Sequence, residues 1–156
     1  MPTTGPRPST RATLRGAARL AAAAGLAVDA YVHAKLADQY DPVKATLSEG
    51  NLFRAEAAAA ALAALLILVW RRPVSEASGW LVAAGGLAAI LVYRYVNVGA
   101  HGPLPAMYEP IWSSDKKTAA LAQIVTLVTA TFLLLSGSRT GAVREKRPRV
   151  RYGQGL

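Results

Sequence analysis

The stretch LFRAEAAAAALAALLILVW, residues 52–70, decides the fold. It is rich in Ala and Leu, which favour helix, and it lacks the period-two alternation of a barrel strand. The apolar layer of a bilayer is about 30 Å thick, and a helix crosses it in about 20 residues. Similar segments occupy residues 14–34, 79–98 and 118–136. The sequence therefore predicts an all-α, integral membrane four-helix bundle over residues 14–136.

The composition excludes several classes of function. The 156 residues include no cysteine and two histidines, which excludes disulfides, thiol chemistry, iron–sulfur clusters and zinc sites rich in Cys or His. No glycine-rich nucleotide motif, P-loop or HExxH motif is present. We therefore expect no metal and no cofactor, assign no catalytic residue and favour a non-enzymatic role.

Charge is distributed unevenly between the two sides of the predicted bundle. Residues 7–19, Arg71, Arg72 and residues 139–151 hold twelve Lys and Arg, and only Glu76 and Glu145 are acidic on that side. Loops 35–51 and 99–117 hold four lysines and five acidic residues. Because positive residues stay on the cytoplasmic side, we expect an antiparallel up-down bundle in the plasma (inner) membrane. Both termini would be cytoplasmic and both loops outside.

The two ends of the chain are predicted to be tails. Residues 1–13, rich in Pro and Thr, are expected to form a disordered cytoplasmic tail, and residues 137–156 a basic cytoplasmic tail. The basic tail suits topology and anionic lipid head groups, so we expect membrane lipids and no nucleic acid as partners. A cleaved signal peptide is an alternative for the first segment, with an apolar region at 20–28 and a small-residue site at 28–30. The apolar and aromatic character continues through Val32, which favours a retained helix.

Each predicted helix carries one strongly polar residue near its outer end. At a rise of about 1.5 Å per residue, these residues lie about 6–8 Å below the outer boundary. They are Asp29, Glu56, Arg94 and Gln123. The matching depth predicts a polar cluster with Arg94 as its hub, because a guanidinium has five donors. His33 would lie above Asp29 on the same helix face, and Asn97 above Arg94.

Three interpretations of this cluster stay open. Buried polar groups can serve only to fix helix register. Ionisable residues within membranes often mark a ligand or ion site instead. Catalysis is the third interpretation. Within the structural one, Arg94 and Arg54 could also extend to lipid head groups without a partner.

The loop GAHGPLPAMYEPIWSSDKK, residues 99–117, contains three prolines and two glycines and so excludes regular helix. One interpretation makes it a lid over the cluster, with His101 and Glu109 pointing inward; the favoured one is an ordinary interfacial loop. A haem or metal held by His33 and His101 is disfavoured because His101 lies beside Gly102 and Pro103 in a loop.

Several motifs resemble those of small four-helix membrane proteins of actinobacteria, which are loosely similar to the DoxX-like families. They are His33, EGNLFRAEAAAAALAALL (49–66) and YRYVNVGAHGPLPAMYEPIWSSDKKTAALAQ (93–123), and the comparable positions are Gly50, Phe53, Gly102, Pro103, Pro105, Glu109 and Asp115. The chain departs from that pattern near Arg94 and at Gln123, where an acid is more usual. The resemblance implies a membrane fold and a link to redox or quinone-associated complexes.

Together these patterns predict a multi-pass membrane protein that binds a small ligand, lipid head group or partner through its outer half. A subunit or accessory of a redox or quinone-linked membrane enzyme is the alternative, and a transporter is a third. Small residues recur at Ala17, Ala21 and Gly25, which permits close helix contacts within the bundle, in a homo-oligomer or in a membrane complex.

Overall fold

Four helices make up most of the computed structural model, which describes the backbone of residues 9–145 and the side chains of residues 9–137. They are α1 (Thr10–Tyr40), α2 (Glu49–Val69), α3 (Pro73–Tyr95) and α4 (Ser114–Glu145). Among these residues there is no β-strand, and two isolated bridges pair Lys44 with Ser48 and His101 with Leu104. The predicted all-α class is confirmed.

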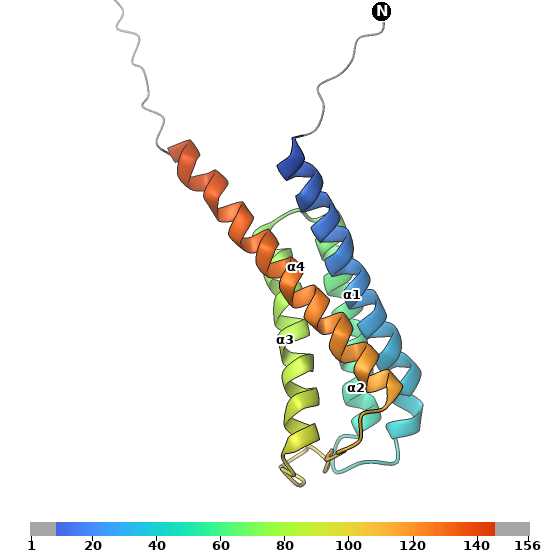
Figure 1. The fold of residues 1–156 in the computed structure, drawn as a ribbon. Helices are drawn as coiled ribbons and strands as arrows, with labels where there is room; N and C mark the ends of the chain where they lie inside the picture. The colour runs from blue at the N-terminus through green and yellow to red at the C-terminus, as the bar shows by residue number, and fades with distance from the viewer. Residues whose placement is uncertain (1–8, 146–156) are drawn as a thin grey trace, which may run out of the picture.

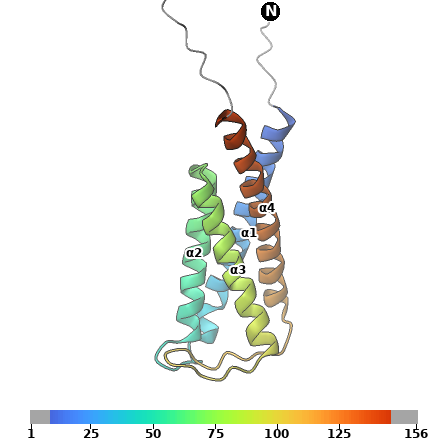
Figure 2. The ribbon, with the colours of Figure 1, turned by 90° about the vertical axis from the view of Figure 1, so that its left-hand side faces the viewer.

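Successive helices run in opposite directions, as the two views in Figures 1 and 2 show. The start of α1, the α2–α3 connection and the end of α4 lie at one end, which we call the terminal end. Loops 41–48 and 96–113 lie at the other, which we call the loop end. The antiparallel up-down arrangement is therefore confirmed.

Each helix contains a segment long and apolar enough to cross a membrane: residues 10–40, 49–69, 73–95 and 114–137. Large apolar side chains also cover the outside of the bundle, among them Leu62, Leu65, Leu81, Leu121 and Leu135. A water-soluble bundle would turn such side chains inward. The length and composition of the four helices, together with the apolar side chains on the outside of the bundle, are typical of an integral membrane protein.

Small residues let the helices approach closely. The core of the bundle consists of Ala22, Leu26, Ala60, Ala63 and Ile67 with their neighbours on α1 and α2. Next to this core on α1, Gly25 contacts α4. A Cβ at position 25 would lie 2.7 Å from the carbonyl oxygen of Ala122, so a side chain there would force the two helices apart.

The helices begin and end at residues other than those predicted. Ser9 caps α1 by accepting a hydrogen bond from the backbone N–H of Ala12 at 3.3 Å, so residues 10–13 are helical and not a disordered tail. Helix α3 starts six residues early, at Pro73, because proline suits the first helical turn. Helix α4 continues to Glu145, so residues 137–145 of the expected tail are helical. Residues 1–8 and 146–156 lie outside the described residues.

Candidate functional site

A buried polar cluster connects α1 to α4 toward the loop end. Gln123 donates a hydrogen bond from Nε2 to Asp29 Oδ1 at 2.8 Å, and both side chains are fully buried. His33 Nδ1 lies 2.9 Å from the backbone oxygen of Asp29 and 3.2 Å from Asp29 Oδ1. A proton on Nδ1 serves both acceptors, which leaves Nε2 without a protein partner among the described residues. Three of the residues predicted for the cluster, Asp29, His33 and Gln123, therefore do lie together.

Glu56 on α2 approaches the same point because Gly86 on α3 has no side chain. A Cβ at position 86 would lie 2.9 Å from Glu56 Oε1 and 3.1 Å from Gln123 Cδ. Any larger residue there would separate the Glu56 carboxyl from the Gln123 amide. Glu56 thus completes a cluster whose members come from α1, α2 and α4, with α3 providing the space.

Three oxygens of this cluster are buried and have no hydrogen-bond donor among the described residues: Asp29 Oδ2, Glu56 Oε1 and Gln123 Oε1. A buried polar atom without a partner costs about 1–3 kcal/mol, and more when it carries charge. The cluster therefore has more acceptors than donors. That imbalance is unusual for a polar contact whose role is only to join helices.

The expectation that Arg94 is the hub of the cluster is wrong. Among the described residues Arg94 forms no ion pair, and its guanidinium carbon lies 5.1 Å from the ring centre of Tyr95 and 5.7 Å from that of Trp112. Asn97 lies beyond the end of α3, where its side chain accepts from the Gly99 N–H at 3.3 Å. Arg94 thus contacts Trp112 of loop 96–113 and pairs with neither acid of the cluster.

A cavity of about 550 Å³ lies between α1, α2, α3, the first turns of α4 and loop 96–113. His33, Glu56 and Gly86 form part of its wall. The rest is mainly apolar and aromatic and includes Val32, Leu36, Leu52, Phe53, Ile90, Tyr93, Leu104 and Met107. Ligand sites in proteins have this character: a largely apolar hollow of several hundred Å³ with a few polar groups directed into it.

Loop 96–113 is fastened over the loop end of this cavity by Glu109. Its carboxylate accepts from Tyr40 Oη at 3.1 Å and forms an ion pair with Lys116 Nζ at 2.8 Å. Lys116 also donates to the backbone oxygen of Glu109 at 2.8 Å. Glu109 lines the cavity, as the lid interpretation expected, whereas His101 is exposed and does not line it.

Arg54 remains on the surface at the loop end and is paired there. Its guanidinium donates to Asp41 Oδ1 at 2.7 Å and to Asp38 Oδ1 at 2.6 Å, so it does not extend to lipid without a partner. The hydrogen bond from Arg54 lowers the pKa of the Asp41 carboxyl below its ordinary value. This group ties the end of α1 to the first turns of α2.

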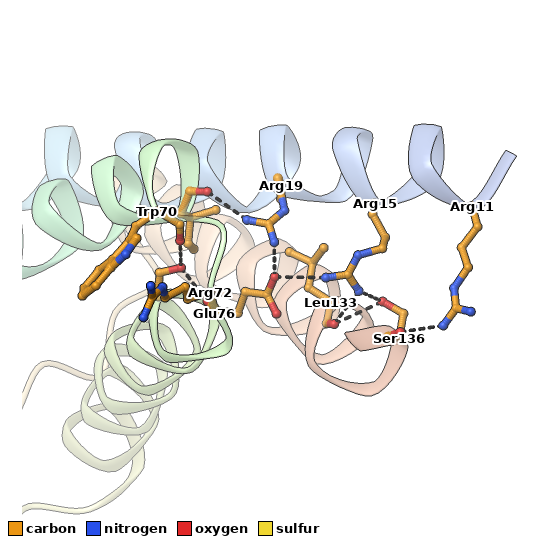
Figure 3. A network of polar contacts seen from close by, with 10 residues as sticks. Arg11, Arg15, Arg19, Trp70, Arg72, Glu76, Leu133 and Ser136 are labelled. Carbon is orange, nitrogen blue, oxygen red and sulfur yellow. Dashed lines mark hydrogen bonds and ion pairs between the residues drawn. The ribbon is translucent and has the colours of Figure 1, made fainter. Parts of the chain in front are cut away.

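A second polar network, which the sequence analysis did not predict, closes the terminal end. Arg15 and Arg19 of α1 converge on Glu76 of α3, as Figure 3 shows. Glu76 Oε1 lies 2.5 Å from Arg19 Nη2 and 3.3 Å from Arg15 Nη2. Arg19 also donates to the Ile67 oxygen of α2, and Arg15 to the Leu133 oxygen of α4, so all four helices meet here.

Two signals in the sequence could have revealed this network. Arg15 and Arg19 are four residues apart and therefore share a helix face. Glu76 follows Pro73 by three residues, as in the first turn of a helix, where an acid is favoured. Assigning Glu76 to a loop hid the pairing.

Among the residues whose side chains are described, no three His, Asp or Glu side chains are arranged to hold a metal ion. Comparisons of the chain with known proteins found no matching family model, no matching curated protein and no matching solved structure.

Proposed function

We propose that this chain is a multi-pass membrane protein that binds a small amphipathic ligand in the cavity at its loop end. The observation that carries the proposal is the set of three donor-less buried oxygens next to an apolar cavity of about 550 Å³. The apolar wall would hold the body of the ligand, and His33 and Glu56 would contact its polar group. Orphan acceptors are costly, so a bound donor would lower the free energy of the site.

The orientation belongs to the same proposal. With the basic excess on the cytoplasmic side, the loop end would face outward and both termini inward in the plasma membrane. The cavity would then open in the outer leaflet, where an amphipathic molecule could enter from the bilayer or from outside. Loop 96–113, fastened through Glu109, would act as a lid.

A second candidate function is a subunit or accessory of a redox or quinone-linked membrane enzyme. The Asp29–His33 pair favours it, because a carboxylate that orients one imidazole nitrogen leaves the other able to exchange a proton with a ligand. The resemblance to DoxX-like proteins points the same way. A visible spectrum with haem or flavin bands, or partner subunits in constant ratio after mild solubilisation, would support this role over simple binding.

The main proposal can be tested by filling the cavity. Ala59 lines it, whereas Ala58, the preceding residue of α2, is exposed and does not. We expect mass spectrometry of the purified wild type to show a small molecule that Ala59→Trp loses and Ala58→Trp keeps. Thermal melting of both variants would verify that each is folded. If the wild type and Ala59→Trp carry the same molecules in the same amounts, the proposal is wrong.

A further inference from the structure

The charges that line the cavity are mostly negative. Glu49, Glu56 and Glu109 all contribute to its wall, against one lysine, Lys116. Lys116 is already paired with Glu109 at 2.8 Å. Glu49 and Glu56 form no ion pair among the described residues, and Glu49 is buried. The cavity therefore attracts positive charge and repels anions.

The hydrogen-bonding groups have the same preference. Behind Glu56, the fully buried Asp29 and Gln123 each present one oxygen without a donor. The donors of the cluster, Gln123 Nε2 and His33 Nδ1, are both used by Asp29. A ligand that only accepts hydrogen bonds would add to this surplus of acceptors, whereas a ligand rich in N–H groups would relieve it.

Aromatic rings provide a third observation. Phe53 packs against Tyr40 at 4.9 Å between ring centres and edge-on against His33 at 5.3 Å, and all three line the cavity with Tyr93. Aromatic faces attract cations, most strongly in a desolvated site. Such a wall therefore suits a ligand that has an apolar body next to a positively charged group.

We infer that the ligand is a hydrophobic organic cation whose primary ammonium group pairs with the Glu56 carboxylate. An ammonium has three N–H donors and no acceptor, which suits a site with donor-less oxygens. Glu49, at the start of α2 and so nearer the loop end, adds a second carboxyl group to the wall of the cavity. The inference rests on the proposed function, because it names the class of molecule that the same cavity binds.

The test uses three probes with one carbon skeleton: 4-phenylbutylammonium, 4-phenylbutanol and 4-phenylbutyrate. Binding to the full chain in detergent at neutral pH is measured by titration calorimetry, with Ala59→Trp as the blank for uptake by the micelle. We expect the ammonium to bind at least about tenfold more tightly than the alcohol, and the carboxylate more weakly than either, since a charged hydrogen bond is worth about 1.5–3 kcal/mol.

Glu56→Gln keeps the size of the side chain and removes its charge. It should weaken binding of the ammonium at least about tenfold and leave binding of the alcohol within about threefold. Asp38→Asn makes the same change of charge on the exposed end of α1, outside the cavity, and should leave both affinities unchanged. If Glu56→Gln does not fold, Glu49→Gln should still weaken the ammonium selectively, and the order of the three probes on the wild type tests the inference without any variant.

The outcomes separate the two proposals. If the alcohol binds as tightly as the ammonium, or if Glu56→Gln weakens both equally, the cation inference is wrong and the binding function stands. If Ala59→Trp binds all three probes as well as the wild type does, both proposals are wrong.

Discussion

Glu76→Gln should be among the most destabilising single substitutions at the terminal end. The Glu76 side chain is 2% exposed, and those of Arg15 and Arg19 are 24% and 12% exposed. Removing the carboxylate leaves two guanidinium groups without a counter-charge in a mostly buried site. Removing one partner of a buried ion pair lowers the free energy of unfolding by about 3–5 kcal/mol.

The low end of that range applies here. Arg15 and Arg19 keep backbone acceptors on Leu133 and Ile67, and Arg15 is exposed enough to be partly solvated. We therefore expect the free energy of unfolding to fall by about 3 kcal/mol. In Arg19→Gln/Glu76→Gln one uncompensated charge is removed together with the acid. The double variant should lose less than the two single losses added together, by about 1–3 kcal/mol.

Reversible unfolding in mixed micelles, followed by circular dichroism, measures both quantities. Asp38→Asn is the matched control, because that acid also pairs with an arginine but is 94% exposed. It should leave the stability unchanged. A loss below about 1 kcal/mol for Glu76→Gln, or strict additivity in the double variant, would refute the idea that this network locks the four helices.

Three further predictions concern packing, acid stability and topology. Gly25→Ala should destabilise the bundle by about 1–3 kcal/mol in the same assay, because its Cβ would meet α4, whereas Gly16→Ala, with open space around it, should stabilise by about 0.5–1 kcal/mol. Because Arg54 lowers the pKa of Asp41, the stability that this pair contributes should be complete above pH 3.8, the ordinary pKa, and should be lost as the pH falls through the lowered pKa. Over that pH range the melting temperature of Asp41→Asn should therefore fall less than that of the wild type. Alkaline phosphatase, which is active only outside, should be active when fused after residues 44 and 110 and inactive after residues 75 and 150, and the reverse pattern would contradict the proposed orientation.

The fold could be predicted because hydropathy and length act on whole segments. Four apolar runs of about 20 residues each must become helices in a membrane, and helices that cross the membrane one after another run in alternate directions. The ends of the helices were predicted less well because caps decide them. Ser9 and Pro73 lie outside the apolar runs, and both extend a helix into polar sequence.

The candidate site shows what depth along a helix can and cannot predict. Asp29, Glu56 and Gln123 were expected at one height, and they do lie around one point near Gly86. Arg94 was expected at that height too, but height does not determine which way a side chain faces. One residue of rotation is about 100°, so a residue at the right depth can lie on the wrong face. Arg94 contacts Trp112 of the loop instead.

The two polar regions differ in a way that divides their roles. At the terminal end the Glu76 oxygen receives two guanidinium groups, and backbone carbonyls of α2 and α4 accept from Arg19 and Arg15. No buried side-chain nitrogen or oxygen of these three residues lacks a partner, so the buried part of that network is saturated. At the loop end one oxygen of Asp29 receives donors from His33 and Gln123, yet its other oxygen, Glu56 Oε1 and Gln123 Oε1 have none, and the cavity lies alongside. A saturated network lowers the energy of one arrangement and so holds the helices in place. An unsaturated one gains energy only when another group supplies donors, which is the property of a binding site and the reason to look for the ligand at the loop end.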